Sequence, residues 1–130
     1  MRHLSWDEFD AAVQWMAAHC DGAGCRGVFG LPRGGLCLAV ALSHRLEVPL
    51  LRAVEPGCLV VDDVYETGRT LEPIRALPDV RTMVWISKVQ PTWWQAVEVT
   101  PSSEWIVFPW ENAAVAAADE LAYRSSRALS

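Results

Sequence analysis

Two adjacent carboxylates followed by a short loop of small and hydroxyl-bearing residues form the part of this sequence best suited to chemistry. Asp62 and Asp63 close the apolar run 58–61, and the Thr-Gly-Arg-Thr segment 67–70 comes shortly after them. Neighbouring carboxylates repel each other, so this pair needs a cation such as Mg²⁺, or hydroxyl donors, close by. The backbone N–H groups of segment 67–70 would wrap a phosphate at the N-terminus of the next helix, where positive partial charge gathers. The alternative is a solvated loop whose acids only cap that helix.

A second loop with phosphate-binding character precedes the first one in the chain. It has the sequence Pro-Arg-Gly-Gly over residues 32–35 and follows the apolar run 28–31. Arg33 offers a planar cationic fork to phosphate oxygens, and Gly34 and Gly35 allow the backbone to approach a ligand closely. Alone, this pattern is equally typical of an ordinary turn. Beside the first loop, it predicts a second group of phosphate contacts.

The elements that must position these loops alternate between strands and helices. A capping-box pattern at Ser5 and Glu8 begins an amphipathic helix, and Asn112 can cap an Ala-rich final helix. Alternation of this kind predicts βαβ units and an α/β fold with a mainly parallel sheet flanked by helices. Such sheets bind ligands at the carboxyl ends of their strands, where both loops belong. The expected strands are 28–31, 48–51, 58–62, 82–87 and 96–99, and the expected helices are 5–19, 36–46, 69–77 and 113–125.

Composition limits the classes of protein and partner. The chain has 130 residues and a net charge of −5, which predicts a single domain over residues 1–130 and argues against nucleic acid or an anionic membrane as a partner. No apolar run approaches the roughly 20 residues that span a bilayer, and the N-terminus turns polar too early for a signal peptide, so we expect a cytoplasmic protein. The four cysteines are expected to be free thiols. His19, Cys20 and Cys25 do not have a standard zinc spacing.

The strand, acid pair and Thr-Gly-Arg-Thr loop together resemble the phosphoribosyl-pyrophosphate loop of the type I phosphoribosyltransferases. The likeness is greatest to the bacterial xanthine-guanine branch and covers roughly residues 5–111. Segment 27–51 resembles that branch's first strand, pyrophosphate loop and helix. Ile86-Ser87-Lys88 resembles its base-contacting strand, and Trp105-Ile106 with Pro109-Trp110-Glu111 resembles its small hood.

This resemblance implies a role for each matching residue around the sugar and its phosphates. Arg33, Gly34 and Gly35 would bind pyrophosphate, and Asp62 and Asp63 would hold the ribose hydroxyls and Mg²⁺. The 5′-phosphate would lie in the loop formed by Thr67, Gly68, Arg69 and Thr70.

The resemblance also implies the residues that hold the base. Glu66 would act beside purine N7, and Lys88 would donate to the 6-oxygen. Trp105 would stack on the ring, the Ile106 backbone would contact the base edge, and Glu111 would bind a second metal ion. Lys88 could instead be a solvated strand end, Trp105 a core aromatic, and Glu111 only the start of the last helix.

The implied activity joins a 6-oxopurine to phosphoribosyl pyrophosphate in a homo-oligomeric, Mg²⁺-dependent enzyme, giving a nucleoside monophosphate and pyrophosphate. A non-catalytic module that binds phosphoribosyl pyrophosphate or a nucleotide is the main alternative, and an unrelated phosphate-binding domain is a third. Two departures from the family matter. Glu66 stands where the purine branch has Asp, and only residues 52–57 remain of a long flexible loop that folds over the site. We expect residues 90–95 or a second subunit to cover the ligand instead.

Overall fold

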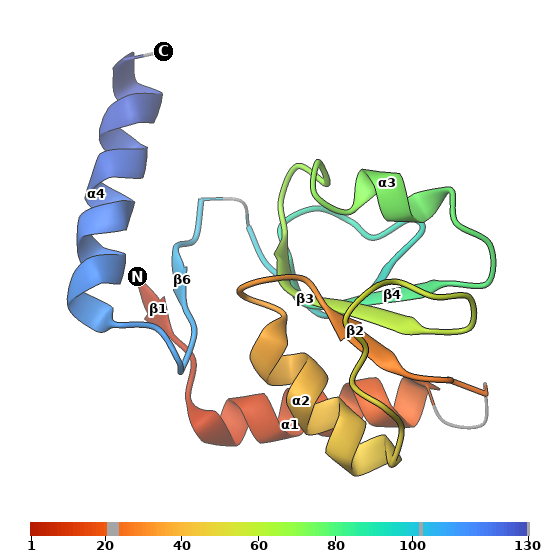
Figure 1. The fold of residues 1–130 in the computed structure, drawn as a ribbon. Coiled ribbons are helices and arrows are strands. Elements are labelled where there is room, and N and C mark those ends of the chain that lie inside the picture. The colour runs from red at the N-terminus through yellow and green to blue at the C-terminus, as the bar shows by residue number, and fades with distance from the viewer. Residues whose placement is uncertain (21–23, 102, 130) are drawn as a thin grey trace.

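Four parallel strands form the centre of the fold. The computed structural model describes residues 1–20, 24–101 and 103–129, the side chains of residues 127–129 excepted. The strands lie in the order β2-β3-β4-β5, and each is parallel to its neighbour (Figure 1). This arrangement confirms the predicted α/β fold. Their bounds are β2 Val28–Gly30, β3 Leu59–Tyr65, β4 Arg81–Ser87 and β5 Gln95–Val99.

Helices cover both faces of this sheet and divide the core in two. Helices α1 (Trp6–Cys20) and α2 (Leu36–Leu46) lie on one face, and the short α3 (Glu72–Arg75) lies on the other (Figure 1). The core on the α1/α2 face includes Met16, Leu38, Leu42, Val61 and Met83. The core on the α3 face includes Val60, Tyr65, Leu71, Ile74, Val84 and Trp94.

Local capping signals were reliable guides to the helix starts. The Glu8 N–H donates to Ser5 Oγ at 3.0 Å, and the Ser5 N–H donates to Glu8 Oε1 at 3.1 Å. This reciprocal pair satisfies two backbone donors that the first turn of α1 would leave open. Asn112 Oδ1 accepts from the backbone N–H groups of Ala114 and Val115 and so caps α4 (Ala113–Leu129).

A second, two-stranded sheet forms the hood beside the main sheet. Strand β1 (Arg2–His3) pairs in parallel with β6 (Ile106–Val107), and α4 leads away from the end of β6, apart from the main sheet (Figure 1). The Arg2 guanidinium donates to the Glu98 carboxylate on β5 and to Glu104 before β6. Arg2 therefore ties the hood to the main sheet. The sequence did not predict β1, because a two-residue strand has no measurable periodicity.

Three predicted elements differ in the structure. The strand expected at 48–51 is a single bridge between Leu50 and Val28. The helix expected at 69–77 is only α3, because a turn that holds segment 67–70 comes first. Strand β3 continues past the acid pair to Tyr65, since its backbone pairs with β4 as far as Ser87. No helix in the described part of the chain is long and apolar enough to cross a bilayer.

Candidate functional site

The two predicted loops meet at the carboxyl edge of the sheet. Strands β2 and β3 are neighbours with Gly30 opposite Val61, so the segments that follow them emerge side by side. Together they enclose a cavity of about 300 Å³. Its lining includes Gly34 of the first loop, the acid pair, and residues of the second loop: Asp62, Asp63, Glu66, Thr67, Gly68 and Thr70.

The acid pair lies in surroundings that disfavour two negative charges. Burial, and then the neighbouring Asp63 carboxylate, raise the pKa of Asp62 from its ordinary 3.8 to about 8. Burial also raises the pKa of Asp63. The Asp63 N–H donates to Asp62 Oδ1 at 2.8 Å, and the Val64 N–H donates to Asp63 Oδ1 at 2.8 Å. Without a cation or ligand donors beside them, the two carboxyl groups share a tendency to keep a proton.

Two glycines allow the loops to touch. A Cβ atom at Gly34 would lie 2.5 Å from Oδ1 of Asp63, and one at Gly35 would lie 2.8 Å from the Leu31 nitrogen. Any side chain at Gly34 would therefore displace the acid pair. This contact explains in physical terms why the first loop needs small residues next to Arg33. The Arg33 side chain is exposed and lines a neighbouring cavity rather than the cavity that contains the Thr-Gly-Arg-Thr loop.

The Thr-Gly-Arg-Thr loop is a turn held by its own backbone. Gly68 has φ of 76°, a left-handed conformation that favours glycine, and its carbonyl accepts from the Glu72 N–H at 2.8 Å. The Arg69 N–H lies 3.4 Å from Thr67 Oγ1, and the Arg69 side chain is exposed. The structure thus brings Thr67, Gly68 and Thr70 into the cavity, while Arg69 is not among its lining residues.

Lys88 is a buried, paired cation and not a solvated strand end. Its side chain is 5 % exposed, and Nζ lies 3.4 Å from Oε1 of Glu66. Nζ also donates to the backbone carbonyl of Glu104. The structure therefore places the two residues expected at the purine N7 and 6-oxygen beside each other, and links them to the segment that enters the hood.

The structure places the three residues predicted in the hood, Trp105, Ile106 and Glu111, in different surroundings. The Trp105 ring is half-buried, lies 5.4 Å from the Tyr123 ring of α4, and has an indole N–H without an acceptor among the described residues. Backbone bonds from β1 reach the Trp105 and Val107 carbonyls, which leaves the backbone groups of Ile106 on the opposite edge of β6. Oε1 of Glu111 accepts from the Phe108 N–H at 2.8 Å and so closes the turn before α4.

The described residues form no complete metal site by themselves. Among residues 1–20, 24–101 and 103–129, no group of three or more His, Cys, Asp or Glu side chains could hold a metal ion. Glu111 shares a cavity of about 600 Å³ with Arg33 and Asp63, but it does not complete a cluster with the acid pair.

Comparison with known proteins supports the family resemblance. The chain is 28% identical to xanthine-guanine phosphoribosyltransferase from Cereibacter sphaeroides, over 85% of this chain and 87% of that protein. Its fold is similar to that of a purine phosphoribosyltransferase from Pyrococcus horikoshii, whose crystal structure matches with a TM-score of 0.70 over 85% of this chain and 93% of that one. The two sequences are 26% identical. In sequence and in fold, the chain is therefore similar to the purine phosphoribosyltransferases of type I.

Two further comparisons complete this picture. The xanthine-guanine-hypoxanthine phosphoribosyltransferase of Helicobacter pylori shares the fold, with a TM-score of 0.71 over 91% of this chain and 98% of that chain at 17% identity. No family model matches the sequence.

The short segment 52–57, which was expected to stand in place of a long flexible loop, lies at the opposite edge of the sheet from the acid pair. The Gly57 N–H donates to the Asp79 carbonyl before β4, and the Arg26 N–H before β2 donates to the Gly57 carbonyl. The turn 52–57 therefore sits at the amino-terminal edge of the sheet, opposite the site. The Trp residues of segment 90–95 do not cover the site either. Trp94 is buried in the core on the α3 face, with its ring stacked on Tyr65, so this candidate lid was wrong.

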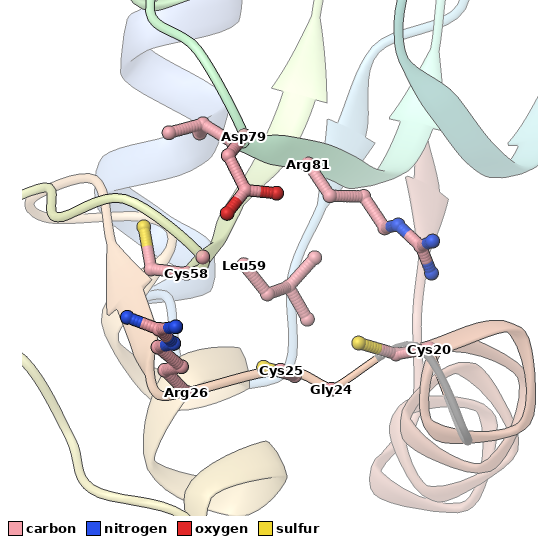
Figure 2. Close-up of a pocket in the computed structure, with 10 residues that line it drawn as sticks. Cys20, Gly24, Cys25, Arg26, Cys58, Leu59, Asp79 and Arg81 are labelled. Atoms are coloured by element: carbon pink, nitrogen blue, oxygen red, sulfur yellow. The ribbon is translucent and has the colours of Figure 1, made fainter.

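A hollow at the amino-terminal edge is not part of this site. It has a volume of about 310 Å³, and Figure 2 shows the thiols of Cys20, Cys25 and Cys58 around it, with charged groups from Arg26, Asp79 and Arg81. Burial, followed by the neighbouring Cys25, raises the pKa of the Cys20 thiol to about 11, and burial raises that of Cys58. The thiols of Cys20 and Cys58 are therefore poor nucleophiles at neutral pH. The four cysteines are free in the structure.

Sequence reasoning missed two residues that shape the site. Arg2 anchors the hood to Glu98 and Glu104, and nothing in the local sequence connects it with them. Tyr65 lies against Gly68 of the Thr-Gly-Arg-Thr loop. Its signal was present in the sequence, because a large aromatic residue stands inside a loop motif otherwise made of small and polar residues.

Proposed function

We propose that this protein is a purine phosphoribosyltransferase that joins a 6-oxopurine to phosphoribosyl pyrophosphate. The observation that carries this proposal is the single cavity in which Gly34, the acid pair and the Thr-Gly-Arg-Thr loop meet. A phosphorylated ribose needs just these groups: backbone N–H donors for its phosphate and carboxylates for its hydroxyls. Close relatives in sequence and structure carry the names xanthine-guanine and purine phosphoribosyltransferase.

The reaction exchanges one bond at C1 of the ribose for another. The C1–O bond to pyrophosphate breaks and its electron pair leaves with the pyrophosphate, while a ring nitrogen of the purine forms the new bond to C1. The ribose carries positive charge in an oxocarbenium-like transition state. Asp62 and Asp63 would hold the ribose hydroxyls, and Arg33 with the backbone of Gly34 and Gly35 would stabilise the leaving pyrophosphate.

The Glu66–Lys88 pair would bind the base. An ammonium group at Lys88 donates to the 6-oxygen of an oxopurine, and the Glu66 carboxylate accepts the proton that the purine gives up at N7. Adenine would present an amino donor to the Lys88 donor, and an unpaired buried polar group costs roughly 1–3 kcal/mol. Guanine, xanthine and hypoxanthine should therefore be preferred. Trp105 would stack on the ring, and the free backbone edge of Ile106 would contact the base.

The acid pair fits a divalent cation. Burial raises the pKa of both adjacent carboxyl groups, the Asp63 carboxylate raises that of Asp62 further, and neither group has a positive partner among the described residues. Asp62 and Asp63 would supply the protein ligands, and oxygens of phosphoribosyl pyrophosphate would supply the others. Bound Mg²⁺ would neutralise charge on the pyrophosphate. Glu111 would contribute at most one carboxylate oxygen to a second ion, since its other oxygen closes a turn.

We also propose a cytoplasmic homo-oligomer. Val115, Leu121 and Tyr123 of α4 are exposed by 56%, 69% and 38%, which is costly for large apolar side chains on a helix that projects from the fold. A second subunit would cover them. It would also supply what the short turn at the far edge of the sheet does not: a cover over the ligand, which excludes water during transfer.

A test of product formation separates this enzyme from a non-catalytic binding module. The protein is incubated with Mg²⁺, phosphoribosyl pyrophosphate and each of guanine, xanthine, hypoxanthine and adenine, and nucleotides are detected by mass. We expect the three oxopurine nucleotides. The double variant Asp62→Asn, Asp63→Asn should form none, while Asp10→Asn, which changes an exposed acid of α1, should match the parent. Tight binding of phosphoribosyl pyrophosphate without any nucleotide would establish the binding module.

A further inference from the structure

Tyr65 stands at the junction between the acid-bearing strand and the phosphate loop. It is the last residue of β3, is 7% exposed, and lines the same cavity as Asp62 and Thr67. Its backbone carbonyl accepts from the Lys88 N–H at 2.8 Å, so the main chain at this position is already fixed.

The phenol end of Tyr65 reaches the loop itself. A Cβ atom at Gly68 would lie 2.6 Å from Cζ of Tyr65, and closer still to its hydroxyl oxygen. Gly68 is the centre of the segment whose N–H groups would hold a phosphate. The missing side chain at Gly68 is therefore what allows a tyrosine hydroxyl to lie against the loop.

The Tyr65 ring has little freedom to move away from this position. It stacks on Trp94 with ring centroids 3.6 Å apart and planes 15° apart, and meets Trp93 edge-on at 6.3 Å. Trp94 is itself buried, and its indole N–H donates to Ser87 Oγ at 3.2 Å. The hydroxyl is thus held by a chain of packed groups that reaches β4.

Among the described residues no protein group hydrogen-bonds to the Tyr65 hydroxyl, and this atom is not enclosed, although the residue as a whole is 7% exposed and lines the cavity. A hydroxyl that opens on a cavity and has no protein partner is available to donate to a ligand bound there. The neighbouring loop adds further donors to the same cavity, because the hydroxyl-bearing Thr67 and Thr70 line it on either side of Gly68. An acceptor with several negatively charged oxygens fits this set of donors.

We propose that the Tyr65 hydroxyl donates a hydrogen bond to the phosphate monoester bound by segment 67–70. This inference rests on the proposed function, since it takes the ligand of this loop to be a sugar phosphate. The hydroxyl supplies a neutral, fixed donor to a dianion in a loop that otherwise relies on backbone N–H groups and threonines. It thereby contributes to the preference for a phosphorylated ribose over the free sugar.

The test compares Tyr65→Phe with the parent protein. Phenylalanine keeps the stack on Trp94 and the contact with Gly68, and removes only the hydroxyl. Calorimetry measures the affinity for ribose 5-phosphate, inorganic phosphate and ribose. We expect Tyr65→Phe to bind ribose 5-phosphate roughly 10- to 100-fold more weakly, as for the loss of a hydrogen bond to a charged group, with free phosphate weakened in parallel. Asp10→Asn, at an exposed acid of α1 away from the site, is the control and should bind as the parent does.

A second measurement does not depend on how Tyr65→Phe folds. In Tyr123→Phe the only tyrosine left is Tyr65, so protein labelled with ¹³C at tyrosine Cζ gives one phenol signal. Ribose 5-phosphate should shift this signal, and ribose should not. An unshifted signal, or equal affinity of Tyr65→Phe and parent for ribose 5-phosphate, would overturn the inference.

The outcome is distinguishable from failure of the proposed function. A protein that makes no nucleotide from purines, yet binds ribose 5-phosphate through Tyr65, would refute the enzyme activity and support the inference. A protein that makes nucleotides but binds ribose 5-phosphate equally well with Phe at position 65 would do the reverse. Parent protein that binds ribose 5-phosphate no better than ribose would refute the phosphate site itself.

Discussion

Replacing one acid of the site should make the free protein more stable at neutral pH. Burial and the Asp63 charge raise the pKa of Asp62 to about 8 from the ordinary 3.8. Between these two values the folded protein keeps a proton that the unfolded chain has released. The free energy of unfolding of the parent therefore falls as pH rises through this window, since the folded state binds more protons. Asp62→Asn cannot ionise and should lose that dependence.

The size of the effect follows from the shift. Each pH unit inside the window changes the free energy of unfolding by at most about 1.4 kcal/mol, so pH 5.5 to 7.5 gives at most about 2.7 kcal/mol. Asp62 is only half-buried, and water that reaches its carboxyl lowers this to roughly 1–2 kcal/mol. Asparagine keeps the oxygen that accepts from the Asp63 N–H at 2.8 Å, so the local structure should persist.

Urea unfolding followed by tryptophan fluorescence measures this directly. The parent, Asp62→Asn and Asp10→Asn are compared at pH 5.5, 6.5 and 7.5 with EDTA present, above the isoelectric point near 5.1. We expect the parent and Asp10→Asn to lose stability together, while Asp62→Asn keeps more of it and is the most stable of the three at pH 7.5. Parallel loss in all three proteins would refute the claim that Asp62 holds a proton in the folded state. Adding Mg²⁺ should then stabilise the parent more than Asp62→Asn.

Three further changes test the geometry of the site. Gly34→Ala would place a Cβ atom 2.5 Å from Oδ1 of Asp63 and should weaken binding of phosphoribosyl pyrophosphate at least about 10-fold by calorimetry; unchanged affinity would contradict the close contact between the loops. Lys88→Met removes the buried donor, so the ratio of kcat/KM for hypoxanthine over adenine should fall about 5-fold or more, and a constant ratio would show that Lys88 does not choose the base. Arg2→Ala frees Glu98 and Glu104, so it should cost about 1 kcal/mol in urea unfolding and raise KM for the purine more than for phosphoribosyl pyrophosphate. Equal changes in both KM values would show that Arg2 does not act through the hood.

Much of the fold follows from signals that are local in the sequence. The Ser5–Glu8 pair and Asn112 mark helix starts because each satisfies backbone donors within one turn. Apolar runs that end in Asp62 and before Arg33 predict buried parallel strands with ligand loops at one edge, because carboxyl ends of parallel strands share that edge. The acid pair and the Thr-Gly-Arg-Thr segment could be recognised for the same reason: all their parts lie within a few residues.

Only the tertiary structure decided how distant segments complete the site. Strand β1 pairs with β6 through Arg2 and Ile106, which are far apart in the chain and carry no periodic signal. The ion pair of Lys88 with Glu66 depends on the register between β3 and β4, and the stack of Tyr65 on Trp94 depends on how segment 90–95 folds back into the core. The short turn 52–57 proved to lie at the opposite edge of the sheet, because its hydrogen bonds connect it to the starts of β2 and β4. Such contacts depend on packing between elements that are distant in the chain. A local sequence pattern does not determine which other element a strand or helix will pack against.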